Sequence, residues 1–303
     1  MSAPLPDTAS LTDGLASILG SSVTIVERRC NPEVGRSPSE IVSCRAGDAT
    51  VELFCKYENG RSTATYEAMV YRDVVEPSGI EAPRLIGTHV DETGRAWLVL
   101  EHLGELPSLD RIDDFASMTA AARWLGQMHT ACEPQPCLRD IPPEYYVDLA
   151  REGVSAAERS GDAPPWLAPL AARFEELAPD LLAVDRTVSH GDFYGHNILF
   201  RNGAVLVIDW EEASVDAGEL DLACLTDGLS SRYWGGCELA YVRARWPDGD
   251  PPADFAKRLE VARLALFFFS IRNREWLEGD KYHRYLMKLH RTGVELGLLE
   301  PTS

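Results

Sequence analysis

The chain has 303 residues, 45% hydrophobic and 25% charged, which is typical of a globular protein with one large or two coupled domains. Its formal net charge of −19 repels phosphate backbones, so a nucleic-acid partner is excluded. We expect a cytoplasmic location, because no signal peptide or membrane-spanning run is found and the seven scattered cysteines form no Cys-x-x-Cys pair.

The first hundred residues are predicted to be rich in strands. A helix is predicted over 62–75, with Tyr66, Met69, Val70 and Val74 on one face and Pro77 ending it. The expected strands are short β-branched or aromatic runs at 23–30, 40–47, 49–57, 84–90 and 95–103. This region therefore reads as an antiparallel sheet with one helix.

The remainder is predicted to be mainly helical. Residues 113–130 carry an apolar stripe, and 253–297 reads as two long helices with the buried run "LALFFFSI". The stripe consists of Phe115, Met118, Ala122, Leu125 and Met128. One β island, 196–210, interrupts the helices. We expect an α+β protein with a small lobe at 1–102, a helical lobe at 103–303, and a small-molecule site in a cleft between them.

The β island carries polar side chains suited to a metal ion. Within it, "RNGA" favours a hairpin with a two-residue turn, and an idealised turn would pair Asn197 with Ile208, one residue short of Asp209. Convergence of the two polar side chains therefore depends on the true loop length. An amide and a carboxylate are hard oxygen ligands that suit Mg²⁺. Upstream, Asp192 in "SHGDFYGHN" could accept a proton from a hydroxyl; the alternative is a turn Asp and two solvated strand ends.

These motifs carry a family resemblance. The segment "SHGDFYGHNILF…VLVIDW" resembles the catalytic segment of the aminoglycoside phosphotransferase and choline-kinase-like family, whose two-lobed fold is shared with protein kinases. "VGRSPSEIVSC" resembles its nucleotide-positioning loop, and "WLVLEHLGE" resembles the linker that bonds the adenine edge. "WLGQMHT" and "GELDLACL" are similar to two further family segments. The match spans roughly residues 25–230.

The resemblance implies a role for each matching residue. Asp192 would be the catalytic base, and Asn197 with Asp209 would hold Mg²⁺ against the phosphates. Lys56 would grip the α- and β-phosphates of ATP while Glu67 holds it extended; a surface ion pair is the alternative. The other implied nucleotide contacts are Gly35, Ser37, Glu101 and Leu103.

Three further residues are expected to support the site. His190 and Asp221 would brace the loop, and His129 would be a satisfied core histidine. The sequence departs from the family in the insert "FYGH" between Asp192 and Asn197. It also lacks the Asp-Phe-Gly and Ala-Pro-Glu stretches of protein kinases, which speaks against a protein-kinase function.

The acceptor is indicated only by charge. Residues 208–221 hold six acidic residues and no basic one. Glu211, Glu212 and Asp216 are candidates for binding the ammonium groups of an aminoglycoside, an amino sugar or choline. A solvated acidic loop is the alternative reading.

The sequence thus predicts an ATP- and Mg²⁺-dependent O-phosphotransferase acting on a small hydroxylated molecule, of the aminoglycoside or antibiotic kinase type. A metabolite kinase for choline, homoserine or an amino sugar is the alternative, with GTP as the alternative nucleotide. A nucleotide-binding pseudokinase is disfavoured because the implied catalytic residues are present. The sequence leaves open the acceptor, the oligomeric state, and whether the role is resistance or metabolism.

Overall fold

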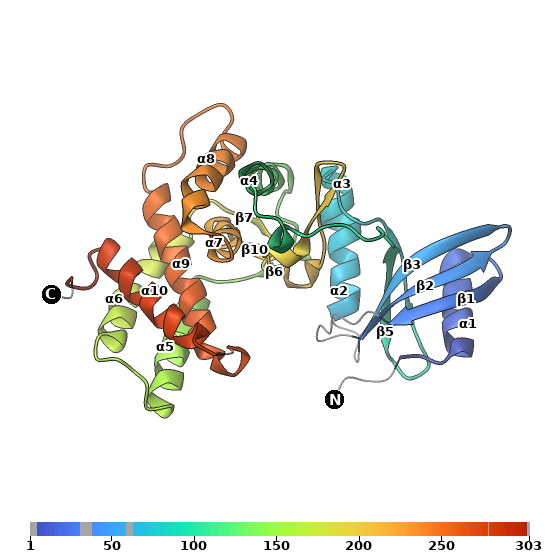
Figure 1. Cartoon of the computed structure of the whole chain (residues 1–303), viewed down its shortest axis with the longest axis horizontal. Coiled ribbons are helices and arrows are strands. Elements are labelled where there is room, and N and C mark those ends of the chain that lie inside the picture. The colour runs from blue at the N-terminus through green and yellow to red at the C-terminus, as the bar shows by residue number, and fades with distance from the viewer. Residues whose placement is uncertain (1–4, 31–37, 59–62, 278, 302–303) are drawn as a thin grey trace. The chain divides into compact units, whose positions relative to one another are not determined.

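The computed structural model describes residues 5–30, 38–58, 63–277 and 279–301 (Figure 1). The chain divides into two compact units. Unit 1 holds the chain up to residue 112 together with residues 196–213, and unit 2 holds residues 113–195 and the chain from residue 214 onward. The assignment of 1–102 to nucleotide binding and 103–303 to catalysis and acceptor binding stays a prediction.

Unit 1 is built on a five-stranded antiparallel sheet in the order β1-β2-β3-β5-β4 (Figure 1). Its strands are β1 (Val23–Cys30), β2 (Ser39–Ala46), β3 (Ala49–Glu58), β4 (Leu85–Val90) and β5 (Ala96–Glu101). All five predicted strands are confirmed, with ends shifted by no more than two residues, because β-branched and aromatic runs between turn residues are strong strand signals.

One helix of unit 1 was not predicted. Helix α1 (Thr8–Leu19) begins after Asp7, whose side chain accepts a hydrogen bond from the Ser10 N–H at 2.8 Å. Its Leu11 and Leu15 are fully buried in the cluster that covers one face of the sheet. An N-capping aspartate followed by leucines four residues apart is the sequence signal for this helix.

Strand β3 alternates between two environments. Leu53, Cys55 and Tyr57 belong to the core cluster with α1. Side chains of successive strand residues point to opposite faces, so Lys56 points away from that core. A mostly apolar strand can therefore aim one ammonium group away from the packed face.

The helix after β3 is longer than predicted. It comprises α2 (Thr63–Val70), a π-helical segment η1 (Tyr71–Val75) and a final turn α3 (Glu76–Ser78). The prediction that Pro77 stops the helix was wrong by a residue, since the helix runs through it to Ser78. The π-helical segment already interrupts the regular hydrogen-bond ladder that a proline would break.

The β island forms the predicted hairpin. Strands β8 (Ile198–Arg201) and β9 (Ala204–Val207) pair in register around Asn202 and Gly203, whose φ angles are 54° and 85°. Both values are positive, as the tight turn requires. The Ile208 N–H donates to the Asn197 carbonyl at 3.1 Å, which confirms the idealised pairing. Short 3₁₀ helices in this unit are η2 (Leu109–Arg111) and η4 (Trp210–Glu212).

Unit 2 is mainly helical. Its helices are α4 (Phe115–Ala131), α5 (Glu144–Arg159), α6 (Leu167–Leu182), α7 (Glu219–Asp227), α8 (Trp234–Arg245), α9 (Phe255–Arg272) and α10 (Lys281–Glu295). The helix predicted at 113–130 and the two predicted within 253–297 are confirmed. The stripe of α4 is buried except at Phe115, which is exposed at the first helical position.

A small three-stranded sheet in unit 2 was not predicted. Strands β6 (Arg139–Asp140), β7 (Arg186–Ser189) and β10 (Ser214–Ala217) lie in the order β6-β10-β7. Segments of two to four residues are too short to show a strand pattern in sequence.

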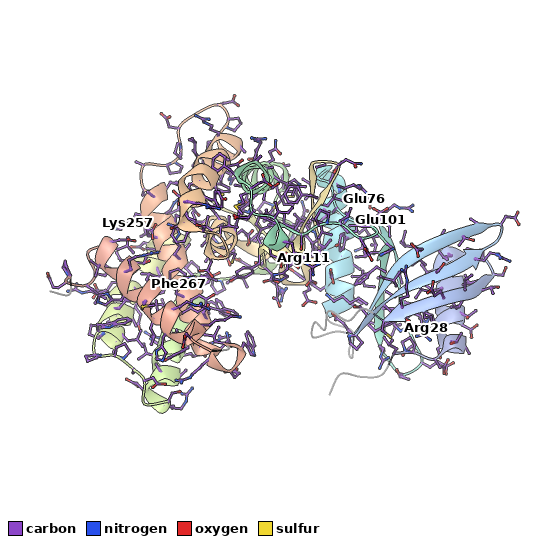
Figure 2. All side chains as sticks on the ribbon, in the orientation of Figure 1. Arg28, Glu76, Glu101, Arg111, Lys257 and Phe267 are labelled. Carbon is purple, nitrogen blue, oxygen red and sulfur yellow. The ribbon has the colours of Figure 1, made fainter. Side chains whose placement is uncertain are left out.

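Helix α9 forms the centre of unit 2 and is buried on nearly every side. One of its buried side chains is Phe267, which is labelled in Figure 2. Its buried Arg263 pairs with Glu238 at 2.6 Å, so the guanidinium enters the core with a carboxylate. The prediction that "LALFFFSI" belongs to a buried helix is confirmed. Among the described residues, no helix is long and apolar enough to cross a membrane.

Helices α4 and α8 approach each other closely at Gly126. A Cβ atom built there would lie 2.6 Å from the Tyr241 carbonyl oxygen of α8. Only a residue without a side chain fits at that distance, so the two helices touch through backbone atoms.

Candidate active site

Lys56 of β3 lies at the centre of a charged cluster in unit 1. Its Nζ atom is 3.0 Å from Glu67 Oε2, 2.8 Å from Asp209 Oδ1 and 2.5 Å from Glu211 Oε2. The Lys56 side chain is 11% exposed and that of Glu67 is 2% exposed. The structure therefore brings the predicted Lys56 and Glu67 together as a largely buried pair, unlike a surface ion pair, which would contribute little.

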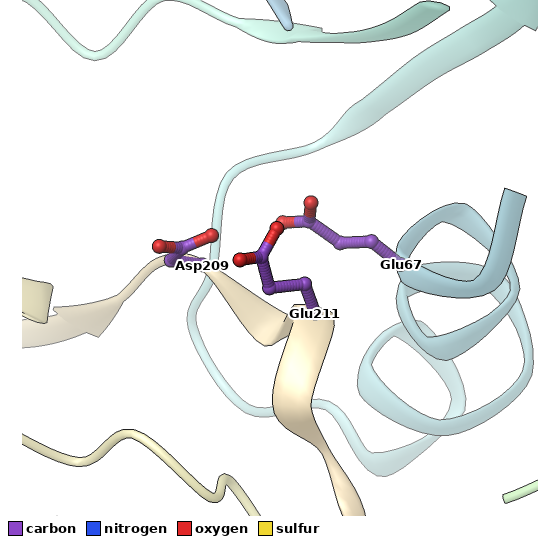
Figure 3. A group of neighbouring side chains, drawn as sticks. All are labelled: Glu67, Asp209 and Glu211. Carbon is purple, nitrogen blue, oxygen red and sulfur yellow. The ribbon is translucent and has the colours of Figure 1, made fainter. Parts of the chain in front are cut away.

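The carboxylates of this cluster outnumber its cation. Glu67 comes from α2, whereas Asp209 and Glu211 follow β9 (Figure 3). One oxygen of each carboxylate lies within 4.8 Å of those of the other two. Three carboxylates around one ammonium leave a formal charge of −2. Oxygen donors with this excess of negative charge are suited to a divalent cation such as Mg²⁺.

The electrostatics of the cluster follow from burial and from this charge imbalance. Burial alone would lower the pKa of Lys56, but the carboxylates of Glu67, Asp209 and Glu211 outweigh it and raise that pKa. Burial, assisted by the two other carboxylates, raises the pKa of Glu67 against the opposing effect of Lys56. The lysine is thus firmly held as a cation.

Hydrogen bonds fasten α2 to the segment after β9. The Trp210 N–H donates to Glu67 Oε1 at 3.2 Å, and the Tyr66 hydroxyl donates to the Ala213 carbonyl at 2.5 Å. Just before Trp210, Asp209 adopts a left-handed backbone with φ of 68°. Aspartate tolerates this conformation better than most residues, and the chain turns there so that the carboxylate meets Lys56.

Asp192 lies in unit 2, in the loop that follows β7. The backbone N–H groups of His190 and Gly191 donate to the Asp221 carboxylate at 2.7 and 2.9 Å. The Asp192 N–H donates to His190 Nδ1 at 3.2 Å, and the Asp192 side chain is half-buried. A buried carboxylate thus fixes the backbone that presents Asp192.

His129 supports the loop indirectly, through its contact with Asp221. Its Nε2 atom is 3.1 Å from Asp221, its Nδ1 atom is 2.9 Å from the Tyr241 hydroxyl, and the ring is buried. Burial would raise the pKa of Asp221, but His129, His190 and the backbone donors lower it overall. Burial lowers the pKa of His129. The predicted bracing of the loop by His190 and Asp221 is seen in these contacts, and the prediction that His129 is a satisfied core histidine is confirmed.

The remaining predicted nucleotide and metal residues within the described part of the chain lie at or near strand ends. Asn197 is buried next to the start of β8. Glu101 ends β5, with its N–H donating to the Arg84 carbonyl at 3.0 Å, and Leu103 follows it in the linker. Gly35 and Ser37 lie outside the described residues.

The three predicted acceptor residues have different surroundings. Glu212 is exposed. Glu211 instead contacts Lys56 within the charged cluster. Asp216 is only 5% exposed; it accepts hydrogen bonds from the Tyr146 hydroxyl and from the Ala217 N–H, so it offers no solvated carboxylate to a ligand. Of the three, Asp216 fits the predicted role least, because burial raises its pKa to about 7.

Sequence reasoning missed the contact of Glu211 with Lys56. The signal was its position two residues after Asp209, at the start of a 3₁₀ turn, but nothing in the sequence fixes the direction of that turn. The Tyr146–Asp216 bond joins residues 70 positions apart and has no local sequence signal.

An antiparallel sheet with a buried Lys–Glu pair, followed by a helical unit carrying a His-Gly-Asp loop, defines an α+β protein-kinase-like fold. The chain belongs to the phosphotransferase enzyme family, whose sequence model matches residues 51–255. It is therefore a kinase-type phosphotransferase with a hydroxyl group as acceptor and a small molecule as substrate. A comparison with curated protein sequences gave no match.

Solved structures share this fold at low sequence identity. One is a thermostable mutant of aminoglycoside phosphotransferase APH(4)-Ia in complex with ADP and hygromycin B, with a TM-score of 0.65, 13% identity, and coverage of 97% of this chain and 100% of that chain. Choline kinase LicA from Streptococcus pneumoniae matches with a TM-score of 0.64 and 15% identity, and the match covers 93% of this chain and 98% of that chain. Macrolide 2′-phosphotransferase MphH from Brachybacterium faecium matches with a TM-score of 0.59 and 15% identity, and the match covers 97% of this chain and 98% of that chain.

Proposed function

We propose that this chain transfers the γ-phosphoryl group of ATP, with Mg²⁺, to a hydroxyl group of a small antibiotic-like molecule, an aminoglycoside being the leading class. The observation that carries this proposal is Lys56, buried within hydrogen-bond distance of three carboxylates in a chain that belongs to a phosphotransferase family. Phosphoryl transfer needs mainly positioning and charge neutralisation, which this cluster is built to supply.

Lys56 would hold the α- and β-phosphates of the nucleotide. A compact ammonium group has three donors, so it can contact phosphate oxygens while still bonded to Glu67. Glu67 is itself held by the Trp210 N–H, which keeps the lysine extended. Gly35, Ser37, Glu101 and Leu103 are the further nucleotide contacts we propose, with GTP as the alternative nucleotide.

Asn197 and Asp209 would hold Mg²⁺. The donor chemistry supports this assignment, because an amide and a carboxylate are hard ligands and the cluster around Asp209 carries a formal charge of −2. When bound, the ion supplies charge neutralisation to the phosphates. The contact between Glu211 and Lys56 adds a carboxylate that the family resemblance did not assign.

Asp192 would orient the acceptor hydroxyl and accept its proton. Its loop is braced by the hydrogen bonds of His190 and Gly191 to Asp221, so the carboxylate is presented on a fixed backbone. A positioned carboxylate in this role contributes about 10²–10⁴-fold to rate.

The acceptor class is supported by charge. The net charge of −19 attracts cationic molecules, and Glu212 is exposed in the acidic segment. The same charge supports choline or an amino sugar, so a metabolite kinase is the second candidate. A cytoplasmic location agrees with seven cysteines that form no disulfide in the described part of the chain.

An acceptor screen tests the proposal. Purified protein with ATP and Mg²⁺ would be incubated with hydroxylated antibiotics and metabolites, and mass spectrometry would detect the gain of one phosphate. We expect transfer to at least one acceptor, and loss of about 100-fold or more in D192A. Transfer by D192A at the wild-type rate would refute the mechanism, and no transfer to any acceptor would refute the antibiotic class.

A further inference from the structure

A second lysine–carboxylate pair lies in unit 2, away from Lys56 in the sequence. Lys288 of α10 places its Nζ atom 2.5 Å from Asp227 Oδ1 at the end of α7, and the Tyr285 hydroxyl donates to Asp227 Oδ2 at 2.9 Å. The Asp227 side chain is 5% exposed and that of Lys288 is 27% exposed. Both carboxylate oxygens are thus engaged, one by the ammonium group and one by the tyrosine hydroxyl.

Aromatic rings complete the surroundings of this ammonium group. Lys288 Nζ lies 4.7 Å from the ring centroid of Tyr285 and 5.5 Å from that of Phe267. The two rings are 6.0 Å apart. One buried carboxylate with two aromatic faces within 6 Å is the set of groups that recognises an ammonium ligand. Here the ligand is a side chain of the protein.

The pair adjoins the loop of Asp192 within unit 2. Tyr194, two residues after Asp192, is hydrogen-bonded to Cys224 of α7, the helix that ends at Asp227. Asp221 of the same helix accepts hydrogen bonds from the backbone N–H groups of His190 and Gly191. Asp227 therefore ends the helix that holds the loop of Asp192 in place.

The use of lysine at this position stands out against the composition. The chain has four lysines among 29 basic residues, and two of the four, Lys56 and Lys288, lie largely buried against carboxylates. An ammonium group is compact enough to sit between a carboxylate and two ring faces, where a planar guanidinium would need a wider space.

We propose that Lys288 is a specificity-determining residue: its ammonium group fills a cation subsite beside the Asp192 loop, so that the acceptor brings no ammonium group to that position. A second cation arriving there would meet a neutral ion pair and the repulsion of Lys288, because Asp227 has no charge left to neutralise it. Cationic groups of an acceptor must therefore bind elsewhere. The effect of Lys288 on acceptor choice rests on the proposed function, whereas the filled cation subsite does not.

The filled subsite is tested by emptying it. K288M keeps most of the side-chain volume and removes the charge. Thermal unfolding would be followed with methylammonium chloride against sodium chloride at equal concentration, about 100 mM. We expect methylammonium to raise the Tm of K288M about 2–4 °C more than sodium does, and to have no such effect on the wild type.

Matched variants locate the effect. K281M removes an exposed lysine at the start of the same helix and should behave as the wild type. The double variant D227N/K288M lacks the carboxylate and should lose the response to methylammonium. K288Q serves as a second test should K288M fold poorly. The proposal would be overturned if K288M and K288Q responded equally to methylammonium and to sodium. It would also be overturned if the wild type responded to methylammonium as strongly as these two variants.

The consequence for acceptor choice is measured separately. In the acceptor screen, K288M should gain at least about tenfold in kcat/KM toward amine-bearing acceptors relative to the wild type. Methylammonium binding without that gain would refute the specificity role and keep the cation subsite. Because the unfolding assay needs no phosphoryl transfer, failure of the proposed function leaves its result interpretable.

Discussion

The two largely buried lysines form opposite kinds of charge cluster. Lys56 in unit 1 faces Glu67, Asp209 and Glu211, which leaves a formal charge of −2. Among the described residues, Lys288 in unit 2 pairs with one carboxylate, that of Asp227, whose other oxygen accepts a hydrogen bond from Tyr285. Negative charge therefore exceeds positive charge around Lys56, whereas the two charges cancel in the Lys288–Asp227 pair.

This difference separates a site that recruits ligands from a site that excludes them. Buried like charges repel strongly, so the Lys56 cluster gains from any further cation that binds its carboxylates. The Lys288 pair is already neutral and gains nothing from a second cation. Net charge within a few ångströms, rather than the presence of carboxylates, distinguishes the two sites.

The largest expected effect comes from changing the cation of the first cluster. K56R keeps the charge but replaces a compact ammonium with a planar guanidinium, which does not fit between three carboxylates and two phosphates. We expect phosphoryl transfer to fall about 100-fold while circular dichroism and Tm stay near wild type. K257R, at an exposed lysine of α9 (Figure 2), is the matched control. Transfer by K56R within a few-fold of wild type would contradict the assigned role.

Removing the cation of the balanced pair should affect stability. K288M leaves Asp227 buried without its partner, which we expect to lower the free energy of unfolding by about 3 kcal/mol in urea titrations at pH 7. D227N/K288M should recover part of that loss, since no unpaired charge remains. A double variant no more stable than K288M would argue that packing, rather than charge, is what Lys288 supplies.

Asp216 is a third buried carboxylate, and it has a tyrosine rather than a lysine as its hydrogen-bond partner. Burial raises its pKa to about 7 from 3.8, so the unfolded chain releases this proton at lower pH than the folded one. The contribution of Asp216 to stability is then fullest below pH 4 and declines as pH rises to 7, by about 4 kcal/mol at about 1.4 kcal/mol per pH unit.

Comparing wild type with D216N isolates this effect. The unfolding free energy of D216N, relative to wild type, should rise between pH 4 and 7 and then level off. A difference that is constant across this range would show that Asp216 titrates at its ordinary pKa.

The smallest expected effect is metal binding without nucleotide. Mg²⁺ at about 10 mM should raise the Tm of the wild type by about 2–4 °C through the excess charge around Lys56. D209N should abolish the rise, whereas D227N, at the balanced pair, should keep it. An equal loss in both variants would mean that the ion binds carboxylates nonspecifically.

Much of the sheet and of the first cluster was predictable from the sequence. The five strands, the Asn202–Gly203 turn and the pairing of Asn197 with Ile208 follow from local patterns, because strand alternation and turn chemistry act over a few residues. Lys56 and Glu67, eleven residues apart, were expected as a pair from the family resemblance and are in contact.

The features that were not predicted depend on contacts between distant segments. Glu211 reaches Lys56 because Asp209 adopts a left-handed backbone, and a pattern of residue types does not encode that turn. The Asp227–Lys288 pair joins residues 61 positions apart through the packing of α7 and α10 around α9. Burial also reversed one expectation, since Asp216 looks like a solvated acid in sequence and lies in the core.

The close approach at Gly126 connects helix packing to the loop that carries Asp192. One methyl group there would press on the Tyr241 backbone, and the Tyr241 hydroxyl contacts His129, which contacts Asp221, which holds the N–H groups of His190 and Gly191. A change far from any reacting atom is thereby transmitted to the backbone that carries Asp192. The spacing of α4 and α8 at Gly126 consequently helps to set the position of the backbone that carries Asp192.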